Sequence, residues 1–155
     1  MAWDLAQPGM GITNIITGTY LSGLPLEAPA TTTYAGWSSW YGVSGNDYLV
    51  DFAFNLDPTL GNYPIMVPTT GTSGLPYWEV QEIDGLAVEY LRRKDAPGTT
   101  YAVQFTDNLQ SNWVDSATTE NVSPINSTWE RVTITDSVPI ANATNRFGRV
   151  TVTQE

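Results

Sequence analysis

From residue 77 onward, apolar and polar residues alternate along the chain with a period of two. Leu86, Val88 and Tyr90, for example, would share one face of an extended segment. Turn-forming residues separate such segments at spacings of about 8–12 residues, a pattern typical of antiparallel sandwiches. We therefore expect an all-β, Ig-like antiparallel β-sandwich over residues 77–155. The expected strands are 77–83, 86–92, 100–106, 129–135 and 147–153.

Two hairpins are expected at the start of this sandwich. Asp84-Gly85 favours a two-residue type I′ turn, because both central residues of that turn need positive φ. This turn would join the first expected strand to the second. Residues 94–98, which contain Pro97 and Gly98, would join the second strand to the third in another hairpin.

The last expected strand carries an irregularity. Phe147 is out of phase with Val150 and Val152, which are themselves two residues apart. One extra residue in the strand would restore the phase, so we expect a β-bulge near Gly148.

One short helix is expected before the sandwich, within residues 46–56. Leu49, Phe52, Ala53 and Leu56 recur there at helical spacing, and Asp57-Pro58 ends the segment. Asn46 or Asp47 can cap its first turn through a side-chain oxygen.

Residues 57–76 hold four Pro and three Gly in twenty residues. They should form an irregular surface loop with at most one short strand, at residues 65–67. With the helix, they make a lead-in that we place at residues 37–76.

Residues 1–36 are expected to form an extended N-terminal arm. Gly, Pro and Thr interrupt this segment throughout, yet it is too rich in apolar side chains for a solvated tail. It should lie on a surface, either of its own domain or of a neighbouring subunit. The expected interface residues of the arm are Trp3, Leu5, Met10, Ile12, Ile15, Ile16, Tyr20 and Leu21.

Composition removes several function classes. The 155 residues include no Cys and no His, which excludes disulfides, Ser-His-Asp triads, Cys-His nucleophiles and His-ligated metal sites. We expect no metal, no cofactor and no enzymatic activity.

A net charge of −10 argues against nucleic-acid and anionic-membrane partners, because a protein binds both through its Lys and Arg side chains. The N-terminus also lacks the basic start and apolar run of a secretory signal, so we expect cytoplasmic synthesis or a leader already removed.

Two clusters are candidate binding features. Trp37, Trp40 and Tyr41 are close in sequence and could form either a core or interface cluster or an aromatic platform for a sugar. Arg92, Arg93 and Lys94 are consecutive basic residues. They could form a solvated turn, or could make salt bridges to the acidic surface of a neighbouring copy.

A resemblance to a known module covers about residues 37–154. The residues that carry it are Arg92-Arg93, Thr100-Tyr101-Ala102-Val103, Asp107-Asn108-Leu109 and Asn112-Trp113. On these residues, the chain resembles the C-terminal β-sandwich module of secreted and surface proteins of verrucomicrobial-type bacteria. The resemblance implies a noncatalytic, externally displayed module. The acidic, calcium-like loop of that module is absent here, where Gly45-Asn46-Asp47 runs directly into the expected helix.

These observations lead to two functional expectations. The first is a structural protein, displayed on a virion surface as a decoration or cement subunit of a phage-type capsid or similar particle. Its partners would be neighbouring copies of itself and a capsid or surface-scaffold protein, reached through the arm. The alternative is a carbohydrate-binding or attachment module of a secreted bacterial protein or cell surface, with a polysaccharide as partner.

Overall fold

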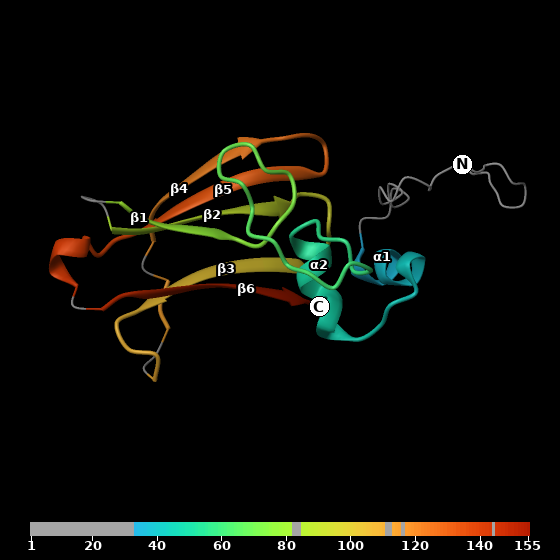
Figure 1. Cartoon of the computed structure of the whole chain (residues 1–155), viewed down its shortest axis with the longest axis horizontal. Coiled ribbons are helices and arrows are strands. Elements are labelled where there is room, and N and C mark those ends of the chain that lie inside the picture. Colours follow the sequence, from blue (N-terminus) through green and yellow to red (C-terminus); the bar gives the residue numbers. More distant parts are fainter. Residues whose placement is uncertain (1–32, 82–84, 111–112, 116, 144) are drawn as a thin grey trace, which may run out of the picture. The chain divides into compact units, whose positions relative to one another are not determined.

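The computed structural model describes residues 33–81, 85–110, 113–115, 117–143 and 145–155 (Figure 1). Two short α-helices precede the strands, where the sequence predicted one. The elements are α1 (Tyr34–Tyr41), η1 (Asn46–Tyr48), α2 (Leu49–Ala53), β1 (Tyr77–Gln81), β2 (Gly85–Arg93), β3 (Thr99–Thr106), β4 (Ala117–Pro124), β5 (Trp129–Asp136), η2 (Ile140–Asn142) and β6 (Phe147–Gln154).

The strands form two antiparallel sheets that lie one above the other in Figure 1. One sheet has the order β1-β2-β5-β4, and the other pairs β3 with β6. The expected antiparallel β-sandwich is therefore confirmed. The strand order is that of strands A-B-E-D and C-F in an immunoglobulin constant-type sandwich.

Apolar side chains from both sheets meet between the layers. Val88, Tyr90 and Val132 come from the four-stranded sheet, and Val103 and Phe105 come from β3. Tyr90 and Tyr101 stack across the core with ring centroids 6.0 Å apart. This packing is what the alternation in the sequence encodes, since every second side chain of each strand points inward.

The helices close one end of the sandwich. Thr33 caps α1 by accepting a hydrogen bond from the Gly36 amide at 3.1 Å, and Gly42 ends it in a left-handed conformation. Helix α1 therefore starts inside the expected arm, three residues before residue 37; residues 1–32 lie outside the described part of the chain. Tyr101 joins α2 to β3, because its hydroxyl donates to the Ala53 carbonyl at 3.0 Å.

Helix α2 follows the sequence prediction with one correction. Leu49, Phe52 and Ala53 are buried, as their helical spacing indicated. The expected cap is wrong: neither Asn46 nor Asp47 makes a side-chain capping hydrogen bond at the start of η1 or α2. Burial of the apolar side chains against the sandwich thus stabilises these two turns without a polar cap.

The first hairpin exists, but its turn differs from the prediction. Gln81 pairs with Gly85, so residues 82–84 connect the strands and Gly85 belongs to β2. A two-residue Asp84-Gly85 turn is therefore wrong. Gly85 is required for another reason: a Cβ atom there would lie 2.5 Å from the Val138 carbonyl oxygen, and its φ is +114°.

The second expected hairpin is wrong. The chain leaves β2 at Arg93 and crosses to the other sheet, where β3 pairs with β6; β2 pairs with β1 and β5. Alternation marked both strands correctly, but it carries no information about which strand lies beside which.

The expected bulge near Gly148 is also wrong. The β3–β6 register is regular from Thr106↔Phe147 to Thr99↔Gln154, and the register shift lies instead in β4, between Ala117 and Thr119. Phe147 is on the outer face of its sheet. Gly148 is on the inner face, where a Cβ atom would lie 2.3 Å from the indole of Trp78.

Residues 57–76 form an irregular loop, as predicted, with an isolated bridge from Ile65 to Leu75. Met66 is buried beneath it against Leu91 and Trp129. These two residues are on the outer face of the four-stranded sheet, so the loop lies over that face.

Candidate functional site

Trp37 belongs to the core and not to a binding surface. It is 5% exposed, and its ring centroid lies 4.9 Å from that of Tyr41 and 5.6 Å from that of Phe52. Tyr34 stacks on it, with ring centroids 5.9 Å apart. The indole therefore packs α1 against α2, in agreement with the core alternative for this cluster.

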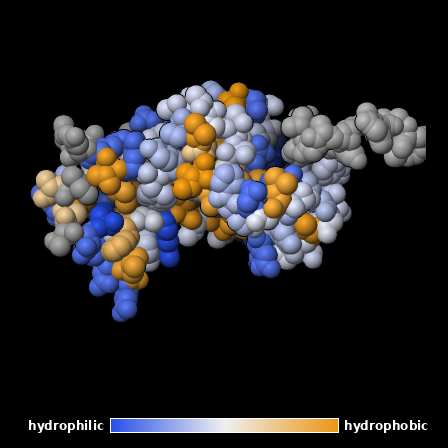
Figure 2. All heavy atoms as spheres, in the orientation of Figure 1, coloured by the Kyte–Doolittle hydropathy of each residue, from blue (hydrophilic) through white to orange (hydrophobic). Residues whose placement is uncertain are grey.

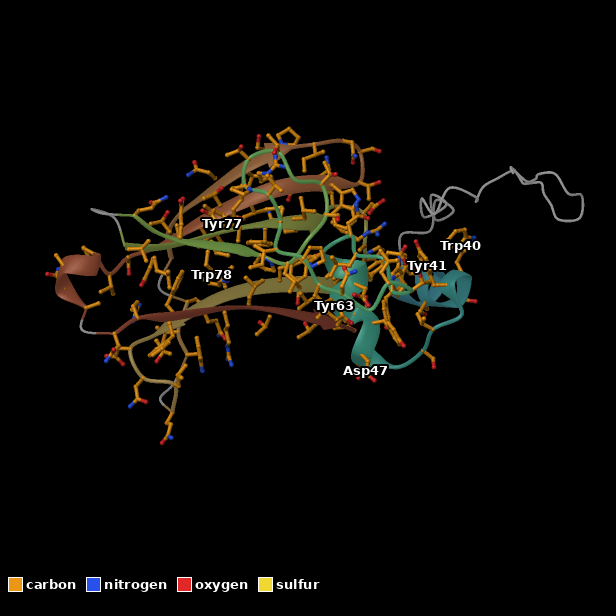
Figure 3. The ribbon with its side chains drawn as sticks, viewed as in Figure 1. Trp40, Tyr41, Asp47, Tyr63, Tyr77 and Trp78 are labelled. Carbon is orange, nitrogen blue, oxygen red and sulfur yellow. The ribbon has the colours of Figure 1, made fainter. Side chains whose placement is uncertain are left out.

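Trp40 is the exposed member of the three expected platform residues. It is 39% exposed, and its ring is nearly perpendicular to that of Tyr41, at 85° and 4.9 Å (Figure 3). Two perpendicular rings offer one flat face, not a continuous platform. The structure thus brings Trp37, Trp40 and Tyr41 together but leaves a single indole available for a ligand.

Arg92, in the expected basic cluster, is engaged within the chain. Its guanidinium forms ion pairs with Glu120 and Glu130, each at 2.6 Å. These two acids come from β4 and β5, so Arg92 ties three strands of the sheet together on one face. Its hydrogen bonds to both glutamates raise the pKa of Arg92 against the opposing effect of burial.

Arg93 is held even more closely. Its guanidinium lies over the rings of Phe52 and Trp129, at 4.4 and 4.8 Å from their centroids, and 3.5 Å from Asp95. Burial lowers the pKa of Arg93. Lys94 is exposed. Two of the three basic residues are therefore engaged within the chain, and Lys94 is the exposed member of the cluster.

A surface that the sequence analysis missed lies on residues 57–76. Leu60, Tyr63, Ile65 and Val67, which we call the apolar loop, are between 50% and 64% exposed. Figure 2 shows hydrophobic residues on the face of the molecule where this loop crosses the sheet. Large apolar patches exposed to solvent typically mark interaction sites, so four exposed apolar side chains within eight residues make this segment a candidate.

The apolar loop is fixed in place by polar contacts beneath it. The Thr69 amide donates to Glu89 at 2.9 Å, and Arg131 donates to the Gly71 carbonyl at 2.5 Å. Arg131 and Glu89 pair with each other at 2.9 Å. Because Met66 and these contacts anchor the segment, its exposed side chains are held outward by a rigid support.

One carboxylate is buried without a partner. Asp51 is fully buried on α2, and neither of its oxygens has a hydrogen-bond partner among the described residues. Burial raises the pKa of Asp51, and the charge of Asp57 raises it further. Within the described ranges, no three Asp or Glu side chains gather as metal ligands would.

The expected arm residues, Trp3 to Leu21, lie outside the described part of the chain. Comparison with protein-family models, curated proteins and solved structures found no match. Among the described helices, none is long and apolar enough to cross a membrane.

The order of residues in the sequence indicates the apolar loop, although the composition of the segment does not. Loops usually carry polar residues, yet this Pro- and Gly-rich segment places Tyr63, Ile65 and Val67 at alternate positions. Only the fold shows that Met66, between them, points inward and leaves the others in solvent.

Proposed function

We propose that the chain is a non-enzymatic structural protein that associates with neighbouring subunits through apolar surfaces. In its most specific form it is an externally displayed decoration or cement subunit of a phage-type capsid or similar particle. The observation that carries this proposal is the apolar loop, four exposed apolar side chains on a rigidly anchored segment.

The free energy of burying apolar side chains favours a permanent neighbour that covers the apolar loop. Fully burying one large apolar side chain contributes about 1.5–3 kcal/mol, so four half-exposed side chains supply a substantial part of a subunit contact. A subunit that binds only to the assembled particle, and not to its separate parts, stabilises the particle by mass action. The net charge of −10 keeps the rest of the surface from associating without specificity.

The test is the mass of the full chain in solution, measured by light scattering on a sizing column across a range of concentrations. The triple variant Leu60→Ser, Ile65→Thr, Val67→Thr replaces three of the four apolar side chains of the apolar loop. The matched control Leu109→Ser, Val114→Thr changes exposed apolar residues elsewhere. We expect the wild type and the control to associate as concentration rises, and the triple variant to associate clearly less at every concentration. Association that is equal in all three would contradict the proposal.

A carbohydrate-binding or attachment module is the second candidate, and the exposed Trp40 favours it. An indole face exposed beside Tyr41 can pack against the apolar face of a sugar ring. This function predicts retention of the full chain on a polysaccharide column, and loss of that retention in Trp40→Ala. Tyr63→Ala is the control, because it removes an exposed aromatic ring from the apolar loop and leaves α1 unchanged.

A further inference from the structure

The two-stranded sheet ends at β6. Among the residues that the structure describes, no strand pairs with the second edge of β6. In the immunoglobulin constant-type order that the six strands follow, a seventh strand occupies that place. The described fold is therefore a sandwich with one strand position open.

The backbone of β6 is oriented to receive a strand. Phe105 exchanges both of its backbone hydrogen bonds with Val114, at 2.8 and 3.0 Å, so its polar groups point away from β6. Gly148 lies opposite Phe105, and its N–H and C=O must also point away from β3. By the same alternation, the N–H and C=O groups of Val150 and Val152 face the open edge.

The side chains beside this edge are incompletely covered. Val80 lies opposite Leu86 in the β1–β2 register and shares its inward face, yet Val80 is 63% exposed. Trp78, which points toward Gly148, is only partly buried, and so are Val150 and Val152 (Figure 3). In contrast, Val132 and Phe105 are fully buried further inside. A seventh strand beside β6 would cover the partly buried group.

We propose that the open edge of β6 is a strand-addition site, and that its occupant is residues 11–21 of a neighbouring copy of this chain. The inference deepens the proposed function and rests on it, because it names one contact through which copies associate. Main-chain hydrogen bonds to β6 supply the affinity, and alternate apolar side chains of the added strand cover Val80 and its neighbours.

The sequence of residues 11–21 suits this role. In an extended segment, one phase would hold three large apolar residues, Ile12, Ile16 and Tyr20, with Asn14 and Gly18 between them. The other phase would hold three threonines, Thr13, Thr17 and Thr19, with Ile15 and Leu21. The first phase matches the apolar inner face, and the second suits the solvated outer face. Ile15 is in the outer phase and provides an internal control.

Chain length favours a neighbouring copy over the same copy. Helix α1 packs on α2, and α2 contacts β6; the C-terminus of the chain, which follows β6, is marked beside α2 in Figure 1. An antiparallel strand on β6 would finish at the opposite end. The connection back to α1 would then be residues 22–32, eleven residues that reach about 36–40 Å at full extension. They would have to run back along a strand of about 27 Å and also pass around the sheet. Pro25 and Pro29 lie within that stretch. A neighbour's arm has no such constraint.

Cysteine trapping tests this arrangement cleanly, because the chain has no Cys. Full-length Val150→Cys is mixed with full-length Ile12→Cys, Ile16→Cys or Ile15→Cys, and oxidised glutathione is added. Val122→Cys replaces Val150→Cys as the matched control, because Val122 is an inward-phase valine on the edge strand β4. Val152→Cys is the second β6 variant, used if Val150→Cys loses its folded circular-dichroism spectrum.

We expect Ile12→Cys or Ile16→Cys to give at least about fivefold more mixed disulfide dimer than Ile15→Cys, because disulfides form only at short Cβ separations. Val122→Cys should give none above background. Equal yields from both phases, or a preference for Val122→Cys, would each overturn the inference. If the wild type still associates in light scattering, the proposed function survives that result; if it does not, both fail.

Discussion

At the residue scale, close packing explains choices that look like irregularities in the sequence. Gly148 interrupts the apolar phase of β6, and the structure shows why: the benzo ring of Trp78 lies where its Cβ would be. The indole packs in turn against Phe105 at 6.2 Å. A small residue in one sheet thus admits the largest side chain of the other.

The first prediction concerns this contact. Gly148→Ala should lower the free energy of unfolding by about 1–3 kcal/mol, because the new methyl group overlaps the Trp78 ring. Urea unfolding followed by fluorescence measures this loss. In a Trp78→Leu background the same substitution should cost clearly less. An equal cost in both backgrounds would show that the glycine is needed for its backbone and not for the indole.

The second prediction concerns Asp51. Burial raises the pKa of Asp51 in the folded state above its value in the unfolded chain. At neutral pH the carboxylate is therefore charged at a cost to the free energy of folding. Asp51→Asn should therefore stabilise the chain at pH 7 by about 1–2 kcal/mol. As pH falls through the folded pKa, the wild type takes up the proton and the difference should shrink. Thermal unfolding of both proteins at pH 7 and pH 5 measures it; a difference that grows toward pH 5 would contradict the assignment.

At the element scale, the sequence predicted what depends on local pattern. Period-two alternation located five of the strands, and the spacing of Leu49, Phe52 and Ala53 located α2. Strand partners were not predictable, because β3 pairs with β6 across more than forty residues of chain. The candidate site divides in the same way: the exposure of Trp40 and Ile65 depends on which neighbours the fold supplies.

The third prediction concerns the connection between the two sheets. Arg146, just before β6, pairs through two nitrogens with the buried Asp136 at the end of β5, with one contact at 2.9 Å. Arg146→Met should destabilise the chain by about 3 kcal/mol, because the buried carboxylate loses its guanidinium. Arg92→Met, which breaks partly exposed ion pairs, should cost about 1 kcal/mol or less. Chemical unfolding compares the two; equal losses would place Arg146 among ordinary surface pairs.

At the scale of the whole molecule, two surfaces of the described chain are exposed without a packing or pairing partner among the described residues. The apolar loop lies over the outer face of the four-stranded sheet, and the open edge of β6 belongs to the other sheet. In the same fold, Arg92 and Arg93 are paired within the chain. A chain with two such surfaces could contact more than one neighbour, which the proposed function requires.

Amide hydrogen exchange of the full chain, measured at several protein concentrations, tests this account most directly. Association would protect the amides of residues 60–67 and the edge-facing amides of Val150 and Val152 more strongly as concentration rises. The edge of β4 should show no such change. Exchange at residues 60–67 and on β6 that is the same at every concentration would contradict the proposal that copies of this chain associate through these two surfaces.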